Sequence, residues 1–393
     1  MIEGENITFE ETLTEPSVKR PYYFQLDVLK AIAIAFVVMD HSLTWEIKGA
    51  MGSIFWERLS IPFFLIVMGF NMGMSFKYRN FKGLLDLYSL DYFIRKIKRY
   101  ILPFIILYLA SILLGVSLGY LSTNEYLLLG FLPFWGPGNW FIPLLFGSIL
   151  VFPIIYWLFE KQPVLTIVLC FLSELIMQAI LWFLYPIGSS PSIAFIITAI
   201  RVNILFYLPA VGLGLWFSKG FDMSNRHNLI VYPYLAFSLL FMFDYATGIV
   251  SSLPGAIGQN MSIIQEFIRG DYTLFFYGYA AFLFLFAMFS LPQTASGIFQ
   301  RVIEKAGKSS YHILLFQIFW MSIVYWSVSQ TASIQHYIPD FAAELGWPSL
   351  FYYIPFYLAN LIVSFIGGMI WYEVENRILH RSKPKAEDLM LRP

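Results

Sequence analysis

Apolar stretches long enough to cross a lipid bilayer recur along the whole chain, and they constrain its fold more than any other feature. They occupy residues 25–44, 54–76, 100–120, 139–159, 164–184, 194–217, 229–249, 272–291, 310–328 and 350–372. A bilayer core takes about 20 mainly apolar residues per helix, and the helix satisfies its own backbone polar groups there. The sequence therefore predicts an all-α, polytopic integral membrane protein with about ten transmembrane helices.

The composition supports this class and argues against others. Hydrophobic residues make up 58% of the 393 positions and charged residues 13%, which leaves too little polar surface for a soluble chain of this length. The formal net charge of +0 argues against nucleic acid as a partner. The single cysteine, Cys170, excludes an intrachain disulfide and a thiolate metal site. We expect no metal and no bound cofactor.

The distribution of Lys and Arg predicts the orientation in the membrane. Of these 25 residues, 20 lie in the N-terminal segment, in the connections after even-numbered stretches and in the C-terminal segment. The positive-inside rule then places both termini in the cytoplasm of a multi-pass plasma membrane protein. We expect a disordered cytoplasmic tail over 1–20, a membrane domain over 21–372 and a charged cytoplasmic tail over 373–393.

Lys30 and His41 lie within the first apolar stretch, eleven residues apart. In a helix this spacing is three turns plus about 20°, so both side chains share one face, ~16 Å apart along the axis. Ionisable residues inside a membrane helix are expensive and usually functional. The alternative is that Lys30 snorkels to the interface and His41 bonds a neighbouring helix. Asp40 projects about 100° away from His41, so we expect it not to orient the imidazole.

Four cations, Arg95, Lys96, Lys98 and Arg99, precede the third apolar stretch. Cations at a helix start, beside free backbone N–H groups, suit the phosphates of a nucleotide-bearing donor such as coenzyme A. The alternative is that this cluster binds anionic lipid head groups.

Three further ionisable residues lie within apolar stretches. Asp244 matches the depth of His41 and is a candidate catalytic partner, the alternative being a bond to the adjacent segment 245–247. Glu174 and Arg201 are at middle depth, and we expect them to pair with each other or to line a polar cavity.

The chain resembles the membrane acyltransferase-3 family at five places in order. The family signature is Arg, ten residues and His in the first membrane helix, and Lys30 and His41 stand at that spacing. The other similar segments are Ile61–Phe70, Lys96 and Arg99 followed by Pro103, Asn139–Pro143, and Gly307–Leu315. Lysine replaces the family's arginine at positions 30 and 96, and lysine lacks the planar guanidinium fork, so donor contacts there are expected to be looser.

The resemblance implies an integral-membrane O-acyltransferase. Such an enzyme moves a short acyl group, expected to be acetyl, from cytoplasmic acyl-CoA as co-substrate to a hydroxyl of an envelope glycan or related extracytoplasmic acceptor. The expected catalytic residues are His41, Lys30 and Asp244. The expected substrate-binding residues are Arg95, Lys96, Lys98, Arg99, Trp140, Ser310 and Tyr311.

The residues alone support the same chemistry, because a neutral histidine near pH 7 can remove the acceptor proton or carry the acyl group. The alternative from another class is a transporter or flippase of a polar solute. Its intramembrane path would use Lys30, His41, Glu174, Arg201 and Asp244.

Overall fold

Helices make up the regular structure of the protein. The computed structural model describes residues 21–43, 45–78, 81–120, 125–187, 190–268, 272–331 and 349–381, and no strand occurs within these ranges. The all-α prediction is confirmed for this part of the chain. The predicted tail over 1–20 lies outside it.

Each predicted membrane stretch coincides with a helix or a bent helix pair. These elements are α1 (Phe24–Ser42), α3 (Ser53–Lys77), α6 (Leu102–Ser117), α7 (Phe141–Lys161), α8 (Pro163–Leu184), the pair α9 (Pro191–Arg201) and α10 (Leu208–Phe217), α11 (Val231–Thr247), α13 (Leu274–Ser290), α15 (Ser310–Thr331) and α17 (Ser349–Arg381). By length and composition, five helical segments in the described ranges suit a membrane crossing, or six if the pair bent by 46° is one span. The count of ten and the location of the termini stay predictions.

Shorter elements connect the long helices. They are α2 (Trp45–Ala50), α4 (Leu84–Leu87), α5 (Leu90–Lys96), the π-helical turn η1 (Ile97–Ile101), the 3₁₀ turns η2 (Glu125–Leu129), η3 (Tyr185–Ile187) and η4 (Ile204–Tyr207), α12 (Ala256–Phe267) and α14 (Ile298–Lys308). Helix α5, η1 and α6 follow one another without a break, so the cations at 95–99 lie inside a helix. The prediction that they stand at a helix start beside free N–H groups is wrong, because the helix begins earlier, after the Ser89 cap.

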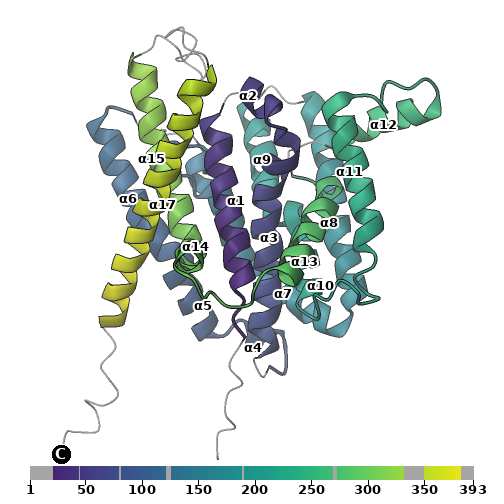
Figure 1. Ribbon diagram of the computed structural model, residues 1–393, viewed down its shortest axis with the longest axis horizontal. Helices are drawn as coiled ribbons and strands as arrows, with labels where there is room; N and C mark the ends of the chain where they lie inside the picture. The colour runs from purple at the N-terminus through teal and green to yellow at the C-terminus, as the bar shows by residue number, and fades with distance from the viewer. Residues whose placement is uncertain are drawn as a thin grey trace, which may run out of the picture.

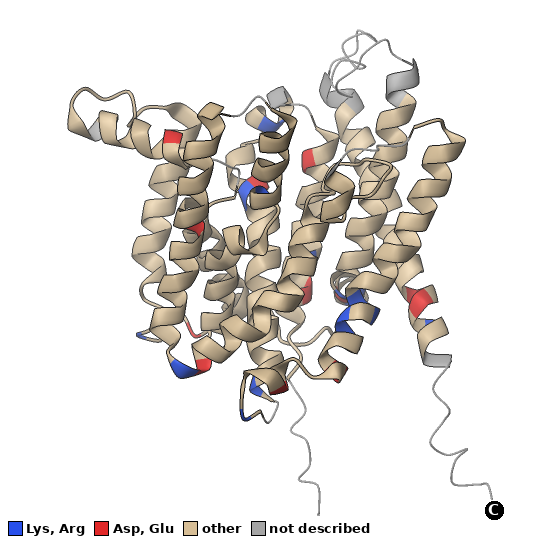
Figure 2. Ribbon diagram, turned by 180° about the vertical axis from the view of Figure 1, so that it is seen from behind, with Lys and Arg blue, Asp and Glu red and all other residues tan. Residues whose placement is uncertain are grey.

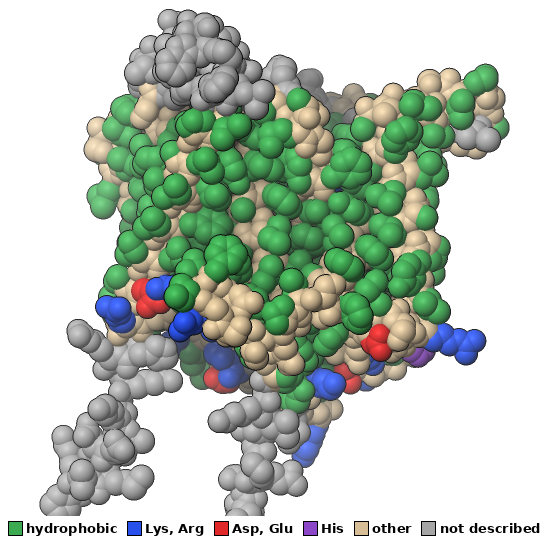
Figure 3. All heavy atoms as spheres, viewed as in Figure 1, with side chains coloured by type: hydrophobic (Ala, Val, Ile, Leu, Met, Phe, Trp, Pro, Cys, Tyr) green, Lys and Arg blue, Asp and Glu red, His purple; other side chains and the backbone are tan. Residues whose placement is uncertain are grey.

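Helix α1 lies in the middle of the bundle and packs against α3, α13, α14, α15 and α17 (Figure 1). The start of α1 and the end of α17 lie at the same end of the molecule (Figure 1). Most Lys and Arg side chains gather at that end, below a wide apolar belt (Figures 2 and 3). This belt is what a bilayer would cover. We call the charged end the cationic face; His41 lies near the opposite end of α1.

Candidate functional site

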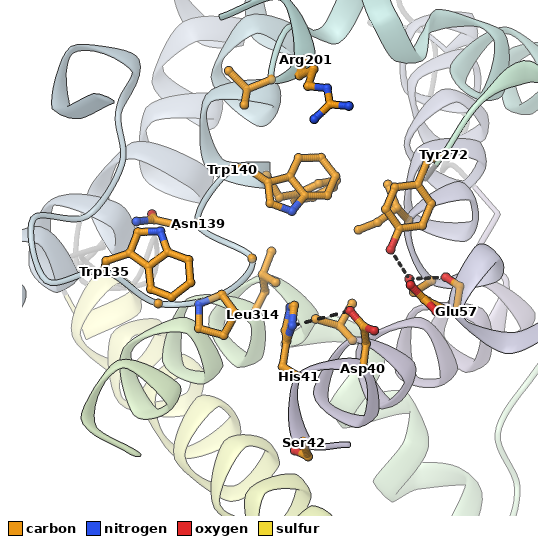
Figure 4. Close-up of a pocket in the computed structure, with 18 of the residues that line it drawn as sticks. Asp40, His41, Ser42, Glu57, Trp135, Asn139, Trp140, Arg201, Tyr272 and Leu314 are labelled. Carbon is orange, nitrogen blue, oxygen red and sulfur yellow. Dashed lines mark hydrogen bonds and ion pairs between the residues drawn. The ribbon is translucent and has the colours of Figure 1, made fainter. Parts of the chain in front are cut away.

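A cavity of about 550 Å³ surrounds His41 (Figure 4). Helices α1, α2, α3, α9 and α15, the turn η4 and the loops before α7 and α13 supply most of its lining. The polar and aromatic residues among it include Asp40, His41, Lys48, Glu57, Ser60, Trp135, Trp140, Arg201, Tyr207, Tyr272 and Tyr325, and Gly138 also lines it. Small-molecule sites typically have volumes of roughly 300–1,000 Å³ with a few convergent polar groups. We call this space the histidine cavity.

The imidazole of His41 has an acidic neighbour that the helical spacing did not predict. Asp40 Oδ2 lies 3.5 Å from His41 Nδ1, and Asp40 Oδ1 accepts a hydrogen bond from Lys48 Nζ of α2. The carboxylate therefore approaches the imidazole to ion-pair distance, which the 100° projection did not predict. Both residues stand in the last turn of α1, where Lys48 draws the carboxylate toward the cavity. A carboxylate beside Nδ1 favours the tautomer that leaves Nε2 free to accept a proton.

Side chains from α15 and α17 fix the end of α1 that carries His41. The Tyr325 hydroxyl donates to the backbone carbonyl of His41 at 3.0 Å. Asn360 Nδ2 donates to Ser42 Oγ at 3.2 Å, while Asn360 Oδ1 accepts from Trp320 Nε1 at 2.9 Å. These side chains were not identified from the sequence, because the contacts with α1 join residues 284 and 318 positions apart and the Trp320–Asn360 bond joins residues 40 apart.

The loop before α7 closes one side of the histidine cavity. The buried Asn139 side chain accepts from Leu132 N–H at 2.9 Å and donates to Leu132 O at 3.3 Å, which folds the loop back on itself. Gly138 has φ +87°, a conformation that favours glycine, and a Cβ built there would lie 3.6 Å from His41 Nε2. The loop therefore runs close beside the imidazole.

Trp140 belongs to the wall of the same cavity. Its ring stacks with Tyr207 at a centroid distance of 5.9 Å and with Tyr272 at 6.0 Å. The Tyr272 hydroxyl lies 3.5 Å from Ser60 Oγ. This aromatic wall therefore has both apolar faces and polar edges.

Two further cavities, of about 180 and 650 Å³, are lined in part by the cationic cluster at 95–99. Both are lined by Lys30, Asn71, Arg95, Arg99, Ser310 and Tyr311. Lys96 lines the smaller one, which we call the inner cavity. Lys98 and Lys308 line the larger one, the entry cavity. The structure thus brings the cationic cluster, Lys30 and the segment at 310–311 together, although they are far apart in sequence.

Lys30 is held by a carboxylate on its own helix. Its Nζ lies 2.5 Å from Asp27 Oδ1, and the Tyr22 hydroxyl donates to Asp27 Oδ2 at 2.5 Å. Burial and the Asp27 carboxylate raise the pKa of the Tyr22 phenol far above its usual range, so the phenol stays a hydrogen-bond donor. The Lys30 ammonium is therefore oriented from one side while its tip lines both the inner and the entry cavity.

Gly307 brings Ser310 and Tyr311 to this place. A Cβ on Gly307 would lie 2.4 Å from Asp27 Cα, so only glycine lets the end of α14 touch the first turn of α1. Tyr311 then donates to the Tyr100 carbonyl at 2.9 Å, which joins α15 to the π-helical turn η1. The motif over 307–311 is explained by this packing.

The inner cavity and the histidine cavity share two lining residues, Phe141 and Leu314. Both side chains are buried, with 3% of their surface exposed. The cationic cluster, Lys30, these two apolar side chains and His41 therefore follow one another along a path through the bundle.

The comparison with protein families identifies this architecture. A family model described as an acyltransferase domain matches residues 23–372, which covers the helices that form the three cavities except the last part of α17. The chain belongs to the membrane acyltransferase-3 family. Neither the curated proteins nor the solved structures contain a match.

In this family member, Asp244 lies away from the histidine cavity. Its buried carboxylate accepts from Val250 N–H at 2.6 Å, from Ser251 N–H at 2.9 Å and from Gln265 Nε2 at 2.7 Å. Asp244 thus caps the end of α11, a structural role close to the alternative considered from the sequence. Among the residues that the structure describes, Asp244 does not line the histidine cavity and makes no contact with His41.

Glu174 and Arg201 of the acyltransferase do not pair with each other. Glu174 is fully buried and accepts from Leu274 N–H at 2.8 Å. Arg201 instead lines the histidine cavity, where its guanidinium also lies 5.5 Å from the ring centre of Tyr185. The pairing prediction is wrong, whereas the alternative of a cavity-lining residue is confirmed for Arg201.

Proposed function

We propose that this protein is an O-acyltransferase that moves a short acyl group, acetyl in the simplest case, from acyl-CoA to an acceptor hydroxyl in the histidine cavity. The observation that carries the proposal is the contact between cavities at Phe141 and Leu314. It links a cationic entry to the histidine of the family signature through the membrane domain. A donor on one side and an acceptor on the other would meet at this point.

The entry cavity has the charge that acyl-CoA requires. Four cations line it: Arg95, Lys98, Arg99 and Lys308. The Arg95 guanidinium also forms an ion pair with Asp91. Arginine and lysine bind phosphate oxygens through charge-assisted hydrogen bonds. We place the nucleotide phosphates here.

The distance along α1 suits the arm of the donor. Eleven residues separate Lys30 from His41, which corresponds to ~16 Å of helix axis. An extended pantetheine arm spans a comparable length. With the phosphates in the entry cavity, the arm passes Lys30 in the inner cavity and the thioester reaches Phe141 and Leu314. The apolar lining there suits a short acyl chain.

His41 then acts as the general base. Nε2 accepts the proton of the acceptor hydroxyl while the oxygen attacks the thioester carbonyl, so the C–O bond forms and the C–S bond breaks. The imidazolium returns its proton to the departing thiolate, which leaves as CoA thiol. Asp40, 3.5 Å from Nδ1, stabilises the transient positive charge.

The transporter alternative receives less support. It requires Glu174 and Asp244 on the solute path, and the structure buries both against backbone N–H groups instead. The acceptor in our proposal is a hydroxyl-bearing envelope molecule, with a glycan favoured by the aromatic wall at Trp140.

Purified protein in vesicles, with labelled acetyl-CoA on the cationic face and a crude envelope glycan fraction on the other, tests the proposal. Wild type should transfer label, and His41→Ala should lower kcat at least ~10²-fold, the usual scale for a positioned base. Lys30→Met, which keeps length and removes charge, should fold but lose most activity. His227→Ala, on an exposed loop, is the matched control and should stay active. Full activity of both His41→Ala and Lys30→Met would exclude the mechanism.

A further inference from the structure

The Arg201 guanidinium lines the histidine cavity but does not share the ion pair formed there by Asp40 and Lys48. Asp40 and Lys48 pair with each other on the side of His41. Among the described residues, no carboxylate forms an ion pair with Arg201. Its side chain is exposed and lines the cavity. A guanidinium that faces a cavity without an ion-pair partner can bind an anionic group of a ligand by charge-assisted hydrogen bonds.

The break between α9 and η4 gives Arg201 this position. Helix α9 ends at Arg201, and Asn203 Oδ1 accepts from Leu205 N–H at 2.9 Å, which starts the next turn at a different angle. The two halves of this span are bent by 46°. Broken helices at membrane depth are tolerated where they line a cavity, and they are a common place for substrate contacts.

The aromatic wall lies between Arg201 and His41. Figure 4 shows the two residues on opposite sides of the cavity, with Trp140 between them. Trp140 stacks with Tyr207, from the same broken span as Arg201, and with Tyr272. A sugar ring lying on this wall would reach Arg201 with one substituent and His41 with another.

We propose that the acceptor is a sugar that carries one anionic group, a carboxylate or a phosphate, and that Arg201 binds this group. The planar guanidinium matches either anion by two parallel hydrogen bonds. Binding it orients the ring so that a hydroxyl on the far side faces His41 Nε2. The proposal rests on the function proposed above and adds its substrate class. Because Arg201 provides a single guanidinium, we expect the bound sugar unit to carry a single anionic group.

Binding of three matched glycosides to the purified protein tests this proposal independently of catalysis. The probes are methyl glucoside, methyl glucuronoside and methyl glucoside 6-phosphate, and the readout is quenching of tryptophan fluorescence with calorimetry as a second measurement. At least one anionic probe should bind ~10-fold or more tightly than the neutral one, the scale of a charge-assisted hydrogen bond. Arg201→Gln should abolish this preference and Arg201→Lys should keep part of it.

Two controls separate this proposal from the catalytic one. His41→Ala should retain the preference for the anionic probe, because binding needs no proton transfer. Arg301→Gln, on an exposed face of α14, should leave it unchanged. Equal binding of all three probes, or a preference that survives in Arg201→Gln, would overturn the role of Arg201. If the preference is present but no acyl transfer occurs, the proposed function fails while the anion site stands.

Discussion

Asp40 Oδ2 lies 3.5 Å from His41 Nδ1, although consecutive residues of a helix project about 100° apart. The approach is possible because Lys48 of the following helix α2 holds the other carboxylate oxygen. The pair resembles the acid–imidazole part of a catalytic triad, in which the acid orients the base and stabilises its charged form. In our mechanism Asp40 is a positioning residue.

Replacing Asp40 with Asn should therefore lower kcat at least ~10-fold while the KM for acyl-CoA stays unchanged, a loss on the scale of general acid–base effects. Because the variant removes a negative charge beside the imidazole, the acidic limb of the kcat/KM profile should move to lower pH. Steady-state kinetics from pH 5 to pH 9 measure both effects. Asp222→Asn, at an exposed carboxylate that lines none of the three cavities, is the matched control and should keep the wild-type profile. An unshifted profile in Asp40→Asn would contradict the assignment.

The cations that line the inner and entry cavities should act on donor binding. Lys96→Ala with Arg99→Ala should raise the apparent KM for acyl-CoA at least ~10-fold and change kcat little, because phosphate contacts are equal in the ground and transition states. Lys161→Ala is the matched control, since Lys161 is an exposed cation that lines none of the three cavities. A donor KM that does not move would instead favour binding of anionic lipid by this cluster.

Phe141 and Leu314, the residues shared by the inner and histidine cavities, should limit the access of water to the thioester. Leu314→Ala opens space at the shared wall, so water should reach the thioester more easily and the ratio of acyl-CoA hydrolysis to transfer should rise several-fold. Truncating a buried leucine also costs about 2–5 kcal/mol of stability. Leu145→Ala controls for this cost, because Leu145 is equally buried at 3% but lines only the inner cavity. The same ratio in both variants would place the acyl path elsewhere.

Replacing Gly307 should lower the stability of the protein and, as a consequence, weaken donor binding. In Gly307→Ala the new methyl would lie 2.4 Å from Asp27 backbone and side-chain atoms, so α14 must move away from α1. We expect a stability loss of about 1–3 kcal/mol, the usual cost of overpacking, and a higher donor KM as Tyr311 shifts. Thermal unfolding in detergent and donor kinetics measure these. Gly297→Ala, at the N-cap of the same helix and with nothing within 4 Å of the new methyl, should be neutral.

The membrane class and the order of helices follow from the sequence, because hydrophobic length is a local property that each segment carries by itself. The spacing of Lys30 and His41 also follows, since both belong to one helix and helical geometry is regular. The positive charge of the cluster at 95–99 also follows from the sequence. Its position inside a helix does not, because the helix begins earlier, at Leu90.

The environment of each of these residues depends on other segments. Glu174 has plausible depth and chemistry, but the N–H group that it accepts from belongs to Leu274, 100 positions away in the chain. Asp244 accepts from N–H groups in the turn directly after its own helix and from Gln265 of α12, 21 positions away. Arg201 and the aromatic wall at Trp140 meet only because a broken span bends toward the loop before α7. The sequence by itself determined which groups lie in the membrane and how far apart they are along one helix. Only the tertiary structure decided which of them face a common cavity, because side-chain direction and pairing are set by contacts between helices that are distant in sequence.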